Sequence, residues 1–286
     1  MKKEEALQQS EQAIEELAES LKAGKSEALI KYLDLVSRFH RYSFGNCMLI
    51  ALQNPDATRV AGFGTWKKLG RMVKKGERGI GILAPMIRKR ETEEAVGNED
   101  NSSKLLCGFR VVHVFDISQT EGNDLAEVPS LVGDPGVNLS YLEAIVRNRQ
   151  IELRYEDIPG GALGLSHGGR ITIQSGLSDV DRFAVLAHEL GHEMLHHAER
   201  RSETDKMVRE TEAEAVAFVV CRSIGIDCTS HASDYIQMYQ GDESTLMRSL
   251  ENVRSVSSGI IVELEQLRMA EIQHGDSPPD LACALG

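Results

Sequence analysis

The segment His188-Glu189-Leu190-Gly191-His192 combines two histidines and a glutamate at a spacing that suits metal-assisted hydrolysis. On a helix, residues four apart share one face, so both imidazoles can bind the same Zn²⁺ ion. The Glu189 carboxylate is rotated away from these nitrogens and can reach a water beside the ion, as a general base must. The motif therefore predicts hydrolysis of a carbonyl substrate, with His188 and His192 as metal ligands and Glu189 as the base.

A catalytic zinc site needs a third protein ligand and keeps one position for water. The extended pattern HExxHxxGxxH does not supply it, because Leu195 and Ala198 stand at its Gly and His positions. His196 and His197 follow on the same predicted helix, where we expect them to be exposed or to support the ligands from behind. The third ligand must therefore come from another segment.

The best source of that ligand is the segment Arg209–Phe218 (RETEAEAVAF). Glu210 and Glu214 share a face of the predicted helix, and small residues between them allow close packing. We expect Glu210 to bind the metal and Glu214 to accept a hydrogen bond from a ligand imidazole. Glu212 points elsewhere on the helical wheel and is expected to be solvated. Glu212 and Glu214 nevertheless stay open as alternatives for the third ligand.

Periodicity and capping residues predict the elements that position these side chains. Ser178-Asp179 can cap a helix that runs through residues 183–197, and a further helix is expected over about 205–223. The other elements expected in this half are helices near 139–149 and 244–268 and strands at 151–155 and 170–174. In the other half we expect two helices within 4–36, a helix at 43–53, strands at 79–87 and 108–115, a polar loop at 91–104 and a linker within 119–136.

The two halves also differ in charge. Residues 126–286 hold 13 Lys and Arg against 26 Asp and Glu, whereas residues 37–90 hold 12 Lys and Arg and only two acids. A basic segment suits polyanions, and an acidic half repels them. The five cysteines are scattered without a CxxC pair, which favours a cytoplasmic protein and excludes a cysteine zinc site. No apolar run is long enough to span a membrane.

The motifs HELGHEMLHH and RETEAEAVAFVV resemble the zincin domain of ImmA/IrrE-type metallopeptidases and of ArdC-type antirestriction proteins. In those families a glutamate on the helix after HExxH completes the metal site, and it opens a pattern that Glu210, Ala213 and Glu214 match. The resemblance also implies that the strand before the active helix, here Arg170–Gln174, pairs with an extended peptide substrate.

The segment from Ser43 to Gly79, together with Val114–Thr120 (VFDISQT), resembles the ArdC-type N-terminal domain that binds single-stranded DNA. Aromatic side chains for base stacking alternate there with cations for phosphates. Composition alone equally allows a core built on Phe63 and Trp66 under a solvated basic loop. Under the resemblance, the expected DNA contacts are Asn46, Gln53, Thr65, Trp66, Lys67, Arg71, Lys74, Lys75 and Arg78.

We therefore predict an α+β protein with a DNA-binding domain at 1–122, a linker at 123–136 and a zincin-like metallopeptidase domain at 137–286. The expected function is a peptidase with one Zn²⁺ per chain that binds single-stranded DNA and cleaves a DNA-associated or regulatory protein, without a membrane partner. The alternative is a non-catalytic antirestriction or DNA-protecting protein whose zinc site is structural or idle. Retention of Glu189 favours the enzyme, because a structural site needs no base.

Overall fold

The computed structural model describes residues 1–23, 26–89, 104–123, 133–227 and 243–274. The chain folds as two compact units, one of Met1–Glu19 and Tyr42–Glu127, the other of Ser20–Arg41 and Val128–Gly286. Both units combine helices with strands, which confirms the α+β fold class. None of the helices in the described ranges has the length and apolar character that a bilayer span requires.

The first unit contains both strands predicted from the apolar runs, and the structure pairs them antiparallel. Its main sheet is antiparallel in the order β1–β4–β3, and β2 and β5 form a separate antiparallel pair. The bounds are α1 Lys3–Lys22, α3 Phe44–Gln53, β1 Val60–Gly62, α4 Phe63–Lys68, β2 Arg71–Val73, β3 Ile80–Lys89, β4 Lys104–Asp116, η1 Ile117–Gln119 and β5 Thr120–Gly122. The stretch 119–136, within which the linker was predicted, thus begins with a paired strand. Residues 124–132 of this stretch and residues 91–103 of the predicted loop lie outside the described residues.

Helix α2, Ser26–Phe39, folds with the second unit. Its apolar face, with Leu29, Leu33 and Val36, is buried, and the helix packs against α8, Lys206–Ser223. The predicted domain at 1–122 includes this helix. In the structure α2 instead belongs to the second unit, because its apolar face packs against α8. Elsewhere the limits 1–122, 123–136 and 137–286 stay a prediction.

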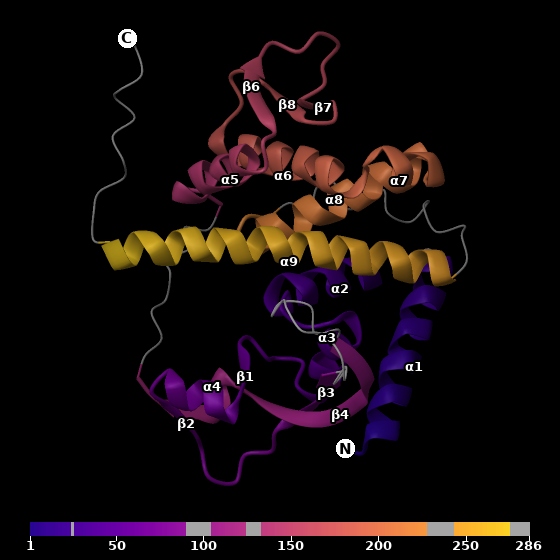
Figure 1. The fold of residues 1–286 in the computed structure, drawn as a ribbon, viewed down its shortest axis with the longest axis vertical. Helices are drawn as coiled ribbons and strands as arrows, with labels where there is room; N and C mark the ends of the chain where they lie inside the picture. The colour runs from indigo at the N-terminus through magenta and orange to yellow at the C-terminus, as the bar shows by residue number, and fades with distance from the viewer. Residues whose placement is uncertain (24–25, 90–103, 124–132, 228–242, 275–286) are drawn as a thin grey trace, which may run out of the picture. The chain divides into compact units, whose positions relative to one another are not determined.

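The second unit places a small mixed sheet on one side of a central helix and further helices on the other (Figure 1). The sheet has the order β6–β8–β7, with β6 parallel and β7 antiparallel to β8. Helix α6 lies between this sheet and α8, and α8 also packs against α9. The bounds are α5 Val137–Asn148, β6 Glu152–Glu156, β7 Gly164–Ser166, β8 Arg170–Gln174, α6 Asp179–Leu195, α7 Ala198–Glu203 and α9 Glu243–His274.

Local sequence explains where α6 and α8 begin and why they approach closely. Ser178 caps α6 by accepting a hydrogen bond from the Asp181 N–H, and Asp205 caps α8 through the Val208 N–H. At Gly191, an added Cβ would lie 3.3 Å from both the Ala213 Cα and the Val216 Cβ. The missing side chain therefore allows the contact that brings the start of α8 over the histidines of α6.

Candidate metal centre and nucleic-acid interface

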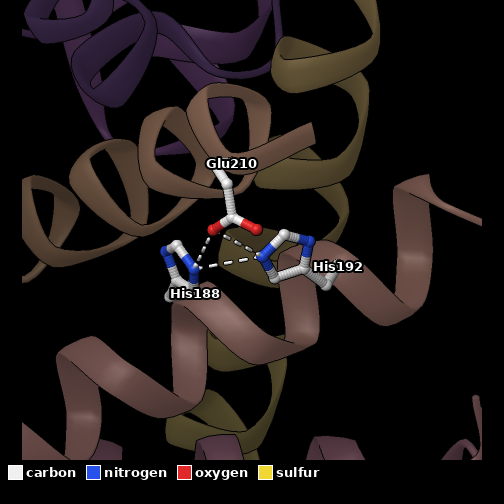
Figure 2. A group of neighbouring side chains, drawn as sticks. All are labelled: His188, His192 and Glu210. Atoms are coloured by element: carbon white, nitrogen blue, oxygen red, sulfur yellow. Dashed lines mark hydrogen bonds and ion pairs between the residues drawn. The ribbon is translucent and has the colours of Figure 1, made fainter. Parts of the chain in front are cut away.

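Helices α6 and α8 bring His188, His192 and Glu210 together, as Figure 2 shows. The Nε2 atoms of the two imidazoles lie 3.1 Å apart. Oε2 of Glu210 lies 3.7 Å from Nε2 of His188 and 3.5 Å from Nε2 of His192. Three potential donor atoms, two nitrogens and one oxygen, therefore form a small triangle.

The size of this triangle fits a tetrahedral metal ion. Ligand atoms about 2.0–2.1 Å from such an ion lie about 3.3 Å from one another, and the three separations run from 3.1 to 3.7 Å. Both Nε2 atoms face the centre, and the donor set contains no sulfur. The residues thus suit a divalent cation with one coordination position left for solvent or substrate.

The three residues of the triangle strongly affect one another's pKa values. The interaction with the His188 imidazole, together with the other nearby positive charges, outweighs burial and holds the pKa of Glu210 at about 2. Burial works against a charged His188, but the nearby carboxylates of Glu210 and Glu214, which can accept its N–H hydrogens, outweigh burial and raise the pKa of His188 to about 9. Burial and the neighbouring His188 lower the pKa of His192 to about 4. The carboxylates thus favour a positive charge at this point, which a bound cation would supply.

Glu189 is 7% exposed and lines the same pocket of about 250 Å³ as the three potential ligands. Burial is the main reason that its pKa rises to about 7, with a further increase from the Glu210 carboxylate, although His188 opposes the shift. Gly164 of β7 lies against this side chain. A carboxyl group with this pKa, beside an open metal position, has the properties of a general base near neutral pH.

Glu214 lies where the sequence predicted it, behind one of the imidazoles. Its Oε2 is 3.2 Å from Nδ1 of His188, so it can accept the Nδ1–H and leave Nε2 free for the metal.

The prediction of a solvated Glu212 is wrong. Glu212 is 1% exposed, and its carboxylate contacts His196 at 2.9 Å, Arg200 at 2.5 Å and the Ser249 hydroxyl. The helical wheel assumed one buried face on α8, whereas α8 packs against α6, α9 and α2. His196 is likewise buried and supports His192 from behind, one of the two positions expected for it, whereas His197 is exposed. The Glu212 carboxylate is therefore engaged by these partners, and the group that could hold a metal contains Glu210 instead.

The predicted role of Arg170–Gln174 in substrate pairing is also wrong. This strand, β8, is central in its sheet, and β6 and β7 occupy both of its edges. The strand that lines the pocket is β7, through Gly164, Leu165 and Ser166. The sequence does not reveal this strand, because its three residues give no alternation to detect.

Glu193, next to the candidate ligand His192, fixes β7 and its turn to α6. Its carboxylate accepts hydrogen bonds from the Ser166 hydroxyl at 2.6 Å and from the N–H groups of Gly168 and Gly169 at 2.8 and 2.7 Å. Both glycines have positive φ angles, 66° and 93°, which other residues rarely adopt. The sequence does not reveal this role of Glu193, because an isolated glutamate on a helix forms no recognisable motif.

Part of the pocket lining is basic. It consists of Arg201, Lys206 and Arg209, although the surrounding half of the sequence is strongly acidic. None of the three forms a salt bridge among the side chains that the structure describes. The guanidinium of Arg209 instead donates to backbone oxygens of Arg201 and Thr204 and so joins α7 to α8.

In the first unit, three of the expected DNA contacts, Trp66, Asn46 and Gln53, are part of the fold. Trp66 is 2% exposed, and its Nε1–H donates to the Phe115 carbonyl at 2.9 Å, so it cannot stack on a base in this conformation. The buried Asn46 amide pairs with the backbone of Leu83 in both directions. Gln53 bonds the backbone of Gly81 in the same way. These residues hold α3 and α4 on the sheet, which the pattern of polar and aromatic residues could not reveal.

The VFDISQT segment has a similar structural role. Asp116 is 2% exposed and accepts hydrogen bonds from the N–H groups of Thr58, Arg59 and Ser118. Although burial opposes its charged form, these bonds lower the pKa of Asp116 below its ordinary value of 3.8. The guanidinium of Arg71 is held by Thr120 and Asn123, and Lys74 donates to the Ser118 carbonyl.

Several other expected contacts are exposed. They are Thr65, Lys67, Lys75 and Arg78. The exposed aromatic residue beside them is Phe63, 50% exposed at the start of α4, and Lys68 is exposed at the end of the same helix. The side chains available for a polyanion therefore include Phe63 and not Trp66.

Two family models match the chain. One describes the N-terminal domain of anti-restriction factor ArdC and matches residues 5–115. The other describes an IrrE N-terminal-like domain and matches residues 146–223, which include both helices of the candidate metal centre. An uncharacterized protein of Bacillus anthracis is 23% identical in an alignment 292 residues long that covers 85% of this chain. The chain spans about half, 49%, of that relative's length.

Two solved structures share the fold. Both are crystal structures of the antirestriction ArdC protein from the R388 plasmid, one metal-free and the other Mn(II)-bound. The metal-free structure has a TM-score of 0.50 and 17% identity, over 91% of this chain and 98% of that chain. The Mn(II)-bound structure has a TM-score of 0.51 and 16% identity, over 90% and 97% of the two chains. Together with the two domain matches, this likeness makes the chain an ArdC-like protein with two domains, an ArdC-type N-terminal domain and an IrrE-like domain.

Proposed function

We propose that this protein is a zinc-dependent peptidase whose N-terminal domain binds single-stranded DNA and brings the catalytic domain to a DNA-associated or regulatory protein. The observation that carries the proposal is the position of Glu189 in the same pocket as the triangle of His188, His192 and Glu210. A bound divalent cation would polarise a peptide carbonyl and make a water molecule more acidic. Glu189 would then accept the proton of that water.

The burial of Glu189 supports a catalytic role over a structural one. A carboxylate that is 7% exposed and has its pKa raised to about 7 costs stability when it is ionised. Within the described residues the Glu189 carboxylate forms no hydrogen bond or salt bridge that would offset this cost. A site that served only to hold a metal would have no need for such a group.

Zinc is the proposed metal because two imidazoles and one carboxylate are a common ligand set of catalytic zinc sites. The Mn(II) ion in the related ArdC crystal structure supports a divalent cation at this fold's site, and it makes manganese the metal to compare with zinc. We expect one ion per chain.

A peptide substrate is supported by the strand that borders the pocket. β7 pairs with β8 through one edge, and its residues line the cavity, so an extended peptide can add to its other edge. This moves the proposed pairing from β8 to β7. The basic lining residues Arg201, Lys206 and Arg209 favour an acidic side chain near the scissile bond.

The proposed DNA contacts of the first unit are Phe63, Thr65, Lys67, Lys68, Lys75 and Arg78, which are exposed and combine one aromatic ring with four cations. Base stacking and phosphate neutralisation without reading of base edges predict little sequence preference. The scattered cysteines keep the cytoplasm as the proposed location.

The alternative is a non-catalytic antirestriction protein, as the solved ArdC proteins are named for antirestriction. The decisive experiment incubates the full-length chain, loaded with Zn²⁺ or Mn²⁺, with host proteins in the presence and absence of single-stranded DNA. New protein N-termini are identified by mass spectrometry. Glu189→Gln keeps the ligands, and Glu156→Gln, on the exposed end of β6, is the matched control.

We expect the wild type and Glu156→Gln to produce the same new termini and Glu189→Gln to produce none, although it retains its metal. Termini that also appear with Glu189→Gln would remove this residue as the base. A metal-loaded wild type that produces no termini under any of these conditions would leave the non-catalytic alternative.

A further inference from the structure

A chain of buried polar groups leads away from the back of His192. Nδ1 of His192 lies 3.1 Å from Nδ1 of His196, and Nε2 of His196 lies 2.9 Å from Oε2 of Glu212. The other carboxylate oxygen, Oε1, accepts hydrogen bonds from Arg200 and from the Ser249 hydroxyl of α9. The side chains of His196 and Glu212 are 2% and 0% exposed, so solvent does not complete their hydrogen bonds.

Only one arrangement of protons satisfies this chain when Nε2 of His192 holds a metal. Nδ1 of His192 then carries a hydrogen and must donate it, so Nδ1 of His196 must accept it. The hydrogen of His196 must therefore be on Nε2, where it donates to the Glu212 carboxylate. Arg200 and Ser249 both donate to that carboxylate, which agrees with its ionised form.

We propose that His196 and Glu212 are positioning residues that fix the orientation and tautomer of the ligand His192. The two ligand imidazoles are then each supported by a carboxylate of α8. His188 is held directly by Glu214 at 3.2 Å, and His192 is held by Glu212 through His196. Glu210, Glu212 and Glu214 thus have three separate tasks on one helix.

Backbone geometry explains how the relay reaches His192. His196 is the C-cap of α6, and its N–H donates to the His192 carbonyl at 3.0 Å. At this point the chain leaves the helix and the imidazole turns back between α6 and α8. Arg200 fixes the turn by donating to the Leu195 carbonyl at 3.2 Å as well as to Glu212.

A purely structural role would not require these polar groups. A buried carboxylate and its partners cost several kcal/mol of desolvation, and apolar residues of similar volume are often no less stabilising in such places. Orientation of a metal ligand does require them, since the hydrogen bond on the far nitrogen determines which nitrogen is free for the metal.

This inference rests on the proposed metal-binding function, so its test measures metal binding and not hydrolysis. Zn²⁺ affinity of the full-length chain is measured by competition with a chromophoric chelator. His196→Leu removes the acceptor for His192, whereas His196→Asn keeps an amide oxygen at about the place of Nδ1. His197→Leu is the matched control, because its imidazole is the adjacent one and is exposed. Thermal unfolding of each metal-free variant reports on the fold separately.

We expect His196→Leu to weaken Zn²⁺ binding by about 10- to 100-fold, His196→Asn to recover most of that loss, and His197→Leu to bind like the wild type. Equal affinities for the wild type and His196→Leu would overturn the positioning role alone. A wild type that binds no Zn²⁺ would overturn both this role and the proposed function.

A second measurement does not depend on whether the leucine variant folds. In the ¹⁵N-labelled, zinc-loaded wild type, long-range ¹H–¹⁵N correlations identify the protonated nitrogen of each imidazole. The His196→Asn spectrum assigns the His196 signals by their loss. We expect the hydrogen of His196 on Nε2 and that of His192 on Nδ1. A hydrogen on Nδ1 of His196 would overturn the relay, because two donors would then face each other.

Discussion

Gly164 and Glu189 are so close that no larger residue fits between β7 and the Glu189 carboxylate. A methyl group on Gly164 would lie 2.6 Å from Oε1 of Glu189 and 2.8 Å from its Cγ. The backbone of Gly164 does not have a positive φ angle. The glycine is therefore required for space and not for conformation, and it determines where the proposed base can lie.

The first prediction is that Gly164→Ala displaces Glu189 without removing the metal. A displacement of about 1 Å can reduce turnover by about 100-fold, because proton transfer depends on the position of the base. Metal content and peptide cleavage are measured on the same preparation. Gly259→Ala, in open space on α9, is the control and should keep full activity. Unchanged cleavage by Gly164→Ala would contradict this account of the pocket.

The second prediction concerns the stability cost of Glu189. Its pKa in the folded protein, about 7, is above the ordinary value of 4.5, so the ionised carboxylate destabilises the fold increasingly as the pH rises through that range. Glu189→Gln cannot ionise and should stabilise the metal-free protein by up to about 3 kcal/mol at pH 8. The difference should disappear as the pH falls towards 4.5. Thermal unfolding of both proteins in the presence of a chelator tests this difference. A Glu189→Gln variant that is less stable than the wild type at pH 8 would contradict the prediction.

The third prediction concerns Asp116, where the pKa shift has the opposite direction. Its folded pKa is lowered, so the stabilisation is fully present above the ordinary value of 3.8 and is lost as the pH falls through the folded pKa. Asp116→Asn should cost about 2 kcal/mol between pH 5 and 8, because the backbone N–H groups lose a charged acceptor. The cost should shrink below about pH 4.

The chain contains one tryptophan, Trp66, which bonds the residue next to Asp116, so its fluorescence reports unfolding of this unit in urea. Asp56→Asn, at an exposed position, is the control and should show no comparable loss. A constant difference between Asp116→Asn and the wild type from pH 8 down to pH 3 would exclude the proposed linkage.

The fourth prediction moves base stacking from Trp66 to Phe63. Phe63→Ala should weaken binding of an oligothymidine by about 1–3 kcal/mol with little change in its salt dependence, since stacking releases no counterions. Lys67→Gln combined with Lys68→Gln should weaken binding and also lower the salt slope. Met72→Ala, a change at another exposed apolar residue of the unit, is the control. Wild-type affinity in the Phe63 variant would remove it from the interface.

The sequence predicted those parts of the metal centre that depend on one helix at a time. The spacing of four residues brings His188 and His192 together, and the same spacing puts Glu210 and Glu214 on one face of α8. The caps Ser178 and Asp205 marked the beginnings of both helices. Local rules were sufficient here because the neighbouring residues themselves fix these relations.

The features that could not be predicted from the sequence depend on how helices and strands pack against one another. Glu212 is buried because α8 has neighbours on three sides, and a helical wheel contains no information about neighbours. β8 is unavailable to a substrate because the three-residue strand β7 covers its edge. Trp66 is in the core because the carbonyl of Phe115, 49 residues away, accepts its N–H.

The central claim is that His188, His192 and Glu210 bind one cation together. Anomalous diffraction from crystals grown with Zn²⁺ tests it most directly, by comparing data above and below the zinc absorption edge. The account predicts one strong peak about 2.0–2.2 Å from both Nε2 atoms and from a Glu210 oxygen. An anomalous map with no peak there, or with zinc held by other residues while this triangle stays empty, would contradict it.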